Sequence, residues 1–333
     1  MKGETMMPTR RKFGLLALSL IGAPTPFGAA FAEDFPSRPV YLIVPYAGGG
    51  SGDLLARLLG DRLSKLWGQQ VVIENKPGAG GLIGTEAAAK SPADGYTLYL
   101  ATDGPLTIAA TLHRRLPYDW KGAFAPISMM AMGYQILLSS PKLPAANLKD
   151  FIALAKDNPG KYNFASIGVG SAPHLAAELF LSMADLKLTH VPYPGSSQQC
   201  IAALMSGDVA MFMVGTSTAT PFVKAGSVRG LAVTAPARID SLPDVPTFTE
   251  LGMPKMDYSL WFAIEAPSGT PAAIINKVHD DIARLAADMD YQKALHIRGF
   301  EAKADTPEQL AAFLQNNYLQ VKPLIERLGL QVN

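Results

Sequence analysis

Cysteine and charge are both scarce in this chain of 333 residues. Cys200 is the only cysteine, which excludes an internal disulfide and predicts a small buried apolar side chain at that position. Charged residues make up 17% of the chain against 48% hydrophobic residues, and the formal net charge is +1. The composition is globular and long enough for two domains, and it has no basic excess that would indicate nucleic acid as a partner.

One short apolar run follows three basic residues near the N-terminus. Arg10, Arg11 and Lys12 precede the apolar stretch 13–23, which is shorter than the roughly 20 residues that span a bilayer. A small-x-small pattern ending at Ala32 then marks a cleavage site. We expect residues 1–32 to be a twin-arginine-like signal peptide, cleaved near Ala32, and the mature protein to be periplasmic. The alternative is a tail anchor or a basic helix.

Cleavage there changes the sign of the net charge. It removes four of the 29 basic residues and one of the 28 acidic residues, which leaves a net charge of −2. A mildly acidic protein has no overall field that gathers anions, so any anion site must be local.

Apolar runs alternate with amphipathic segments beyond residue 39. The expected strands are 40–44, 71–73, 96–101, 136–139, 162–166, 189–191, 209–214 and 230–234. Helices are expected between them, including one capped by Asn147 and one that follows Ser171. This alternation predicts an α/β fold with layers around largely parallel sheets.

Two helices are expected near the C-terminus. Pro271 is placed at the first helical position of one helix, and the residues from Thr306 to Gln309 form a capping box that begins the other. Pro323 is expected to kink or restart the second helix.

No catalytic or metal-binding pattern is complete. The residues around Ser51 approach the Gly-x-Ser-x-Gly elbow of serine hydrolases, but Asp53 stands where the last glycine belongs. The glycines of 78–84 miss the dinucleotide pattern by one position, and the five histidines lack the spacing of metal ligands. We therefore expect no metal, no cofactor and no enzymatic activity.

Two glycine-rich junctions between a strand and a helix remain, at 45–51 and 166–171. Neither contains lysine or arginine. Free N–H groups at a helix start, with roughly half a positive charge from the helix dipole, can bind a carboxylate. Two such junctions would hold both ends of a dicarboxylate, or one carboxylate and a polar tail. The alternative is a pair of tight turns in which Ser51 and Ser171 cap the helices.

Several further motifs occur in a fixed order along the chain. They are Pro36–Val40, Ile43–Gly50, Glu74–Gly81, Asp94–Leu98, His190–Tyr193, Leu242–Thr247 and Ala266–Pro271. In these motifs the chain resembles the Bug receptors, which are the substrate-binding components of tripartite tricarboxylate transporters. The likeness extends over essentially the whole expected mature chain.

The resemblance implies a periplasmic binding protein fold of type II, with two α/β domains joined by a hinge around a ligand cleft. One domain would hold 33–132 and 257–333, and the other 133–256. It implies a solute-binding protein that captures a small carboxylate for the permease subunits of such a transporter, and we expect a monomer. The alternatives are a ligand-sensing receptor for a membrane signalling partner and a serine hydrolase built on Ser51 or Ser171.

The resemblance also implies which residues bind the ligand, largely through backbone groups and ordered water. They are Tyr46, Ala47, Gly48, Gly49, Ser166, Gly168, Ser171 and His174, with Thr102, Asp103 and Tyr193 as weaker candidates. The alternative for His174 is a ring that hydrogen-bonds neighbouring backbone and fixes the turn.

Three positions depart from the family pattern. Pro194 replaces a common basic residue, Asp103 stands where a neutral residue is more frequent, and 211–213 lacks the usual acid. An acid at position 103 would repel a second carboxylate or pair with an amino or amide nitrogen of the ligand.

Overall fold

The structure is a computed structural model that describes residue 1, residue 3, residues 35–256 and residues 258–331. The basic, apolar and cleavage regions of the expected signal peptide therefore lie outside the described residues. Within the described part of the chain, none of the helices combines the length and apolar character needed to cross a membrane.

Lobe 1 is built on parallel strands covered by helices. β1 pairs in parallel with β2 and with β3, as continuous apolar runs predict. Leu55, Leu59 and Leu63 of α1 are buried at helical spacing in the same core as these strands. The elements of lobe 1 are β1 (Val40–Val44), α1 (Ser51–Trp67), β2 (Val71–Asn75), η1 (Ala79–Gly81), α2 (Leu82–Ala89), β3 (Thr97–Ala101), η2 (Gly104–Ile108), α3 (Ala109–Leu112), β9 (Ser259–Pro267), α8 (Ala272–Ala287), α9 (Met289–His296), β10 (Phe300–Ala302) and α10 (Pro307–Arg327).

Lobe 2 repeats the alternation of strand and helix. β5 pairs in parallel with β6 and with β7. Asn147 caps α4 as predicted, because its Oδ1 accepts the backbone N–H of Asp150 over 3.0 Å. The elements of lobe 2 are α4 (Leu148–Lys156), β5 (Asn163–Ser166), α5 (Ala172–Ala184), β6 (Thr189–Pro192), α6 (Ser197–Ser206), β7 (Met211–Gly215), α7 (Thr216–Lys224) and β8 (Arg229–Val233).

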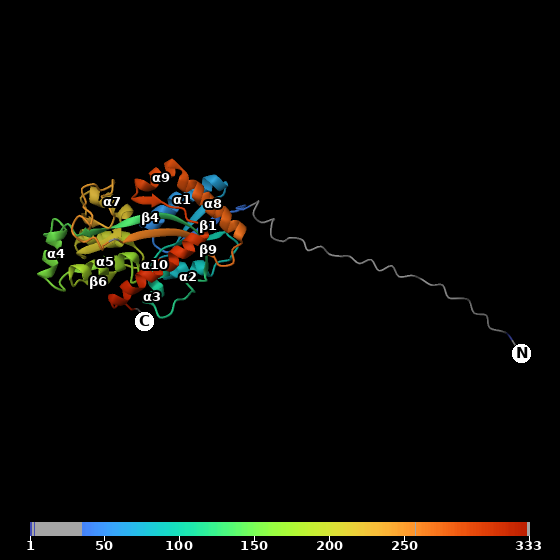
Figure 1. Cartoon of the computed structure of the whole chain (residues 1–333), viewed down its shortest axis with the longest axis horizontal. Helices are drawn as coiled ribbons and strands as arrows, with labels where there is room; N and C mark the ends of the chain where they lie inside the picture. Colours follow the sequence, from blue (N-terminus) through green and yellow to red (C-terminus); the bar gives the residue numbers. More distant parts are fainter. Residues whose placement is uncertain (2, 4–34, 257, 332–333) are drawn as a thin grey trace.

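One long strand, β4 (Phe124–Ser139), belongs to both lobes. It pairs antiparallel with β9 up to Tyr134 and with β7 and β8 from Gln135 onward. The strand order is β2-β1-β3-β9-β4-β7-β5-β6, with β8 and β10 also paired to β4. Figure 1 shows β4 and β9 running through the middle of the molecule. The sheet is therefore mixed rather than largely parallel, because β4 and β9 run in opposite directions at its centre.

The C-terminal part of the described chain differs from the prediction in three respects. It contains three helices instead of two, since α9 follows α8 directly. Pro271 is the N-cap of α8, one position before the predicted one. Pro323 lies inside α10 without ending it. Both Pro323 and Leu319, whose carbonyl loses its helical partner, are exposed, so water can satisfy that carbonyl. The predicted capping box of Thr306 and Gln309 is confirmed.

Candidate functional site

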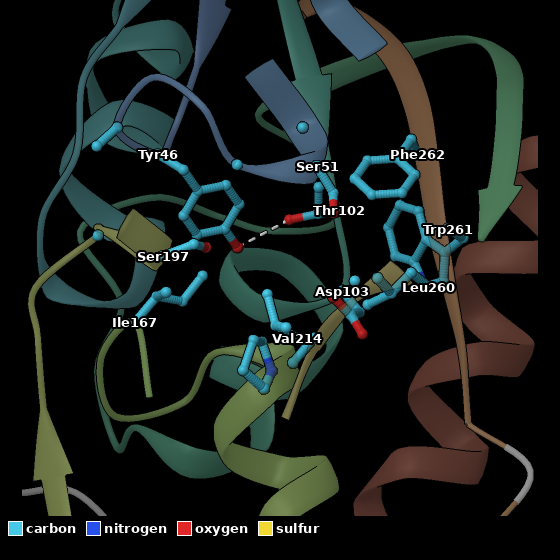
Figure 2. Close-up of a pocket in the computed structure, with 17 residues that line it drawn as sticks. Tyr46, Ser51, Thr102, Asp103, Ile167, Ser197, Val214, Leu260, Trp261 and Phe262 are labelled. Atoms are coloured by element: carbon cyan, nitrogen blue, oxygen red, sulfur yellow. Dashed lines mark hydrogen bonds between the residues drawn. The ribbon is translucent and has the colours of Figure 1, made fainter. Parts of the chain in front are cut away.

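A small cavity of about 50 Å³ lies between the lobes, where strands end and helices begin (Figure 2). One water needs roughly 10–15 Å³ by this measure, so the cavity has room for a few waters. None of the described residues that line it is lysine, arginine or histidine. They are Tyr46, Ala47, Gly50, Ser51, Gly52, Thr102, Asp103, Ile167, Ala172, Pro173, Gly195, Ser197, Val214, Gly215, Leu260, Trp261 and Phe262.

Four helices begin at this cavity. Ser51 of α1, Ala172 of α5 and Ser197 of α6 are first helical residues that line it, and Gly215 is the N-cap of α7. Each helix start presents unpaired backbone N–H groups and roughly half a positive charge. The cavity therefore offers neutral donors to an anion, and none of its described lining residues could form an ion pair with one.

Three of these four helix starts carry no side-chain cap within the described structure. Gly50 rather than Ser51 is the N-cap of α1, and Ser171, although it is the N-cap of α5, makes no capping hydrogen bond. The Ser171 hydroxyl donates instead to the carbonyl of Gly168 over 2.7 Å. The interpretation of Ser51 and Ser171 as capping serines is therefore wrong, and the first N–H groups of both helices are left for other acceptors.

Asp53 brings a negative charge close to the start of α1. Burial raises its pKa, but hydrogen bonds from Arg57 and from the backbone of Gly49 outweigh burial and hold the pKa below its usual value. The Asp53 carboxylate is therefore ionised and neutralised by Arg57, which lies 2.9 Å away. Both charges of this ion pair lie on α1, so the negative charge of Asp53 is balanced within lobe 1.

Several hydrogen bonds join the two lobes around the cavity. The N–H of Ala47 donates to the carbonyl of Gly195 over 2.9 Å, and the side-chain amide of Gln198 donates to the carbonyl of Gly49 over 3.0 Å. The hydroxyl of Ser51 lies 2.7 Å from that of Ser217. These bonds hold the lobes in a closed arrangement. In this arrangement the N–H of Ala47, on the loop before α1, already has an acceptor in lobe 2.

Polar side chains form the inner wall. The hydroxyls of Tyr46 and Thr102 lie 3.1 Å apart. The Asp103 carboxylate accepts the hydroxyl of Tyr258 and the N–H of Gly104, each over 2.8 Å. Burial raises the pKa of Asp103 to about 6, although both hydrogen bonds act in the opposite direction. Near neutral pH the site thus holds a buried carboxylate close to its neutral donors.

Four of the predicted ligand contacts, Tyr46, Ala47, Thr102 and Asp103, line the cavity. Gly48 and Gly49 belong to the same loop but lie outside the wall. Tyr193 also lies outside it, and its N–H donates to the carbonyl of Ser166.

The remaining predicted contacts, Ser166, Gly168, Ser171 and His174, do not line the cavity. The hydroxyls of Ser166 and Ser171 donate to the carbonyl of Gly168, and His174 accepts from Gly170. Neighbours on the same loop, Ile167 and Ala172, line the cavity instead. Direct contact of these four residues with a ligand stays a prediction.

His174 stacks on His190 with ring centroids 4.2 Å apart. Its Nδ1 accepts the N–H of Gly170 over 3.3 Å, which is the backbone bond that the structural interpretation of this ring predicts. Burial lowers the pKa of His174 to about 3 and that of His190 to about 4, and His190 further lowers that of His174. Both rings are therefore neutral at pH 7. The pair is not evident from the sequence because the two residues lie on different elements.

A serine and a histidine do meet in this region. The hydroxyl of Ser166 lies 2.6 Å from Nε2 of His190. Ser166 is fully buried, does not line the cavity, and also bonds the carbonyl of Gly168. A nucleophile at Ser166 cannot reach a ligand in the cleft. The hydroxyls of Ser51 and Ser171, on which the hydrolase interpretation is built, bond Ser217, Thr218 and the carbonyl of Gly168 rather than a histidine.

Several wall residues escape sequence-based reasoning. Ser197 and Gly195 follow the His190–Tyr193 motif, and their nearness to a helix start was the available signal. Gly215 and Leu260 carry no such signal, since they reach the cavity only through the pairing of β7 and β9 with β4.

The two-lobed α/β fold and a cleft lined by helix starts define a solute-binding protein of the periplasmic type. Residues 55–330 match the family described as "Tripartite tricarboxylate transporter family receptor". The chain belongs to this family of solute-binding receptors.

Relatives and solved structures agree with this assignment. BugT of Bordetella pertussis is 35% identical over 299 residues, which cover 90% of this chain and 91% of BugT. A Rhodopseudomonas palustris protein solved with adipate has a TM-score of 0.86 at 31% identity, over 90% of this chain and 99% of that one. MatC from Rhodopseudomonas palustris with bound malate has a TM-score of 0.82 at 28% identity, over 87% of this chain and 100% of MatC.

Proposed function

We propose that this protein captures a small carboxylate in the cavity between its lobes, outside the cytoplasm, and delivers it unchanged to the membrane permease of a tripartite tricarboxylate-type transporter. The observation that carries the proposal is the convergence of four helix starts on one cavity with no lining cation. The signal-like N-terminus supports export, and the adipate-bound and malate-bound relatives support the ligand class.

Opening and closing of the lobes would govern capture. A cavity of about 50 Å³ is smaller than a ligand of four or more carbons needs, so entry requires the lobes to separate. Separation breaks the bond from Ala47 to Gly195 and frees that N–H for a carboxylate. The ligand then replaces the contacts between the lobes with contacts to both of them, which favours closure around it.

Neutral donors suit a protein that must release its ligand. If the ligand were paired with a buried basic residue, its release would leave that residue as an unpaired buried charge, which is costly. A carboxylate on backbone N–H groups is bound by charge-assisted hydrogen bonds alone, so its release leaves no such charge. We propose that the permease lowers the affinity by holding the lobes apart, and that no change of protonation of a basic residue is involved.

Thermal unfolding of the mature protein with a panel of mono-, di- and tricarboxylates tests the proposal. A ligand at a hundredfold excess over Kd stabilises the folded state by about 2.7 kcal/mol. The neutral methyl esters of the same acids are the ligand control and should leave Tm unchanged.

A pair of variants locates the site. Ser51→Asp places a carboxylate at the start of α1 and should abolish the ligand-induced shift in Tm, because that carboxylate repels the ligand and competes for the same N–H groups. Ser182→Asp adds the same charge at an exposed position of α5, away from the cavity, and should keep the shift. If no acid in the panel moves Tm, or if both variants respond like the unmodified protein, the proposal is wrong.

A further inference from the structure

A second and larger cavity, of about 630 Å³, lies beside the cleft. It is bounded by α10 and by the segment around Tyr258, and it shares two lining residues, Asp103 and Trp261, with the cleft cavity. A ligand that extends past these two residues therefore has room to continue. The inference that follows rests on the proposed function, since it concerns the far end of the captured carboxylate.

Asp103 and Trp261 both lie near the end of the paired strands β3 and β9. β3 and β9 pair antiparallel, with Leu100 opposite Ile264 and Ala101 opposite Ala263. β3 ends at Ala101, two residues before Asp103, and Trp261 lies two residues before Ala263 on the paired strand, so both residues lie near this end of the strand pair. Figure 2 shows both side chains on the same side of the cleft, near Leu260.

Trp261 offers a hydrogen-bond donor that has no partner. Its side chain is 2% exposed, and its indole Nε1 has no hydrogen-bond partner among the described residues. The ring is fixed by an edge-to-face contact with Phe313 of α10, with centroids 5.6 Å apart. A buried indole N–H usually has an acceptor, and the Trp261 residue that carries this one lines both cavities.

Asp103 offers acceptors beside that donor. Oδ1 accepts from Gly104 and Oδ2 accepts from Tyr258, so each oxygen keeps capacity for a second hydrogen bond. Asp103 makes no salt bridge in the described part of the chain, and the two cations of the larger cavity, Lys255 and Arg327, are exposed. The Asp103 carboxylate therefore has two hydrogen-bond donors and no cation bonded to it, and it can accept further hydrogen bonds from a ligand.

We propose that Asp103 and Trp261 together select a carboxylate whose far end carries an N–H donor beside an oxygen acceptor, as in a primary carboxamide or an amino acid head group. The nitrogen of that group donates to Asp103, and its oxygen accepts from the indole N–H of Trp261. The first carboxylate lies at the helix starts of the cleft. A plain dicarboxylate is disfavoured, because its second charge would face the Asp103 carboxylate.

Calorimetric titration of the mature protein at pH 7.5 tests this selection. The probes are succinate, glutarate and adipate, the monoamide of each acid, and the 2-amino derivative of each acid. We expect at least one monoamide or amino acid to bind about 5- to 100-fold more tightly than the dicarboxylate of the same length, the range set by leaving a buried polar group unsatisfied. Preference for the monoamide over the amino acid, or the reverse, distinguishes the two head groups.

Two variants then separate the partners. Asp103→Asn removes the charge and should bring the two affinities within about threefold, or reverse their order, since an amide can donate to the second carboxylate. Trp261→Phe keeps a ring against Phe313 but removes the N–H, and should weaken the amide or amino acid by about tenfold. The matched controls are Asp240→Asn, on the exposed surface, and Trp120→Phe, outside both cavities, which should keep the preference of the unmodified protein.

The unmodified protein decides the question even if a variant fails to fold. Dicarboxylates that bind as tightly as their monoamides and amino acids overturn the selection by Asp103 and Trp261, while capture of a carboxylate stands. An unchanged preference in folded Asp103→Asn overturns it as well. If none of the probes and none of the wider acid panel binds, the proposed function itself has failed.

Discussion

The backbone N–H of Ala47 donates to the carbonyl of Gly195 over 2.9 Å, and this main-chain bond joins lobe 1 to lobe 2 at the edge of the cleft. Gly195 has a φ of +77°, and a Cβ at this position would lie 2.6 Å from the side chain of Pro77 in the opposite lobe. Glycine is therefore required on steric and conformational grounds alike. The lobes approach this closely because glycine stands at this point of contact.

A methyl group at the lobe interface should hold the protein open. Gly80 has a φ of +66°, and a Cβ there would lie 2.4 Å from the carbonyl oxygen of Val169 in lobe 2. We expect Gly80→Ala to weaken ligand affinity by at least about tenfold, because backbone atoms cannot move aside as a flexible side chain can. Small-angle scattering with saturating ligand should show a larger radius of gyration than that of the unmodified protein.

Gly68→Ala is the matched control for this change. Gly68 has nearly the same φ, +64°, but a Cβ there would meet no atom within 4 Å. Both substitutions carry the strain of a left-handed alanine, about 1 kcal/mol, and only Gly80→Ala adds the clash between lobes. Equal ligand affinity in the two variants would contradict closure as the step that Gly80 permits.

The stacked histidines should make the protein less stable in mild acid. The pKa values of His174 and His190 are lowered by burial to about 3 and about 4, below the ordinary value of 6.5. The unfolded chain therefore binds more protons at these two positions below pH 6.5, and the stability that the rings contribute is lost as the pH falls from 6.5 towards 4, by at most about 1.4 kcal/mol per pH unit for each ring. Glu178, 3.7 Å from His174, acts in the opposite direction, because burial raises its pKa and its contribution to stability therefore grows as the pH falls.

His190→Phe isolates this contribution while keeping an aromatic ring on Phe164 and His174. Near pH 7.5 the variant should lose about 1 kcal/mol with the hydrogen bond to Ser166. The difference in Tm between the variant and the unmodified protein should then shift in favour of the variant as the pH falls from 6.5 to 5, because the opposing contributions of Asp103 and Glu265 are common to both proteins. Parallel curves over that range would mean that His190 does not titrate with unfolding.

Local pattern accounts for much of the fold. The strand predicted at 40–44 has those bounds, because a buried parallel strand is a continuous apolar run that ends at a turn signal. β9 is absent from the prediction although it is nine residues long. An apolar run of nine residues is compatible with a strand or with a buried helix, and Glu265 near its end breaks the apolar pattern. The antiparallel centre of the sheet depends on β9, so the sequence alone did not indicate a mixed sheet.

The candidate site divides in the same way. Tyr46 and Ala47 are predictable because glycines follow a buried strand and precede a helix, which is a local signal. Gly215 reaches the wall through the pairing of β7 with β4, and Trp261 through β9, so both depend on contacts between distant segments. The division of the chain at 132/133 and 256/257 stays a prediction, as does ligand contact by the loop from Ser166 to Ser171.

The single thiol should report unfolding. Cys200 is fully buried, and burial raises its pKa to about 12, so it is neither accessible nor ionised near pH 8. We expect Ellman's reagent to label the folded protein only as fast as it unfolds, and a bound ligand to slow labelling in proportion to the stabilisation it gives. Ser182→Cys adds an exposed thiol and should react at once. Rapid stoichiometric labelling of the unmodified protein without denaturant would contradict the burial of Cys200.

A buried glutamate should limit stability in alkaline solution. Glu265 is 2% exposed, its Oε2 has no hydrogen-bond partner among the described residues, and burial raises its pKa to about 8 from an ordinary 4.5. The folded protein therefore holds a proton that the unfolded chain has lost, and the resulting stability declines as the pH rises from 4.5 to 8. Above pH 8 the buried carboxylate ionises, at a cost of a few kcal/mol at most.

Glu265→Gln keeps the shape of this side chain and removes its titration. The variant should match the unmodified protein near pH 5 and exceed its Tm by several degrees at pH 8.5. Neither Asp103 nor the histidine pair obscures the upper part of this range, because their pKa values lie at or below about 6. Glu326→Gln, at an exposed position of α10, is the control and should leave the pH dependence unchanged. A constant difference in Tm between the Glu265 variant and the unmodified protein from pH 5 to pH 8.5 would show that Glu265 is ionised throughout, in spite of its burial.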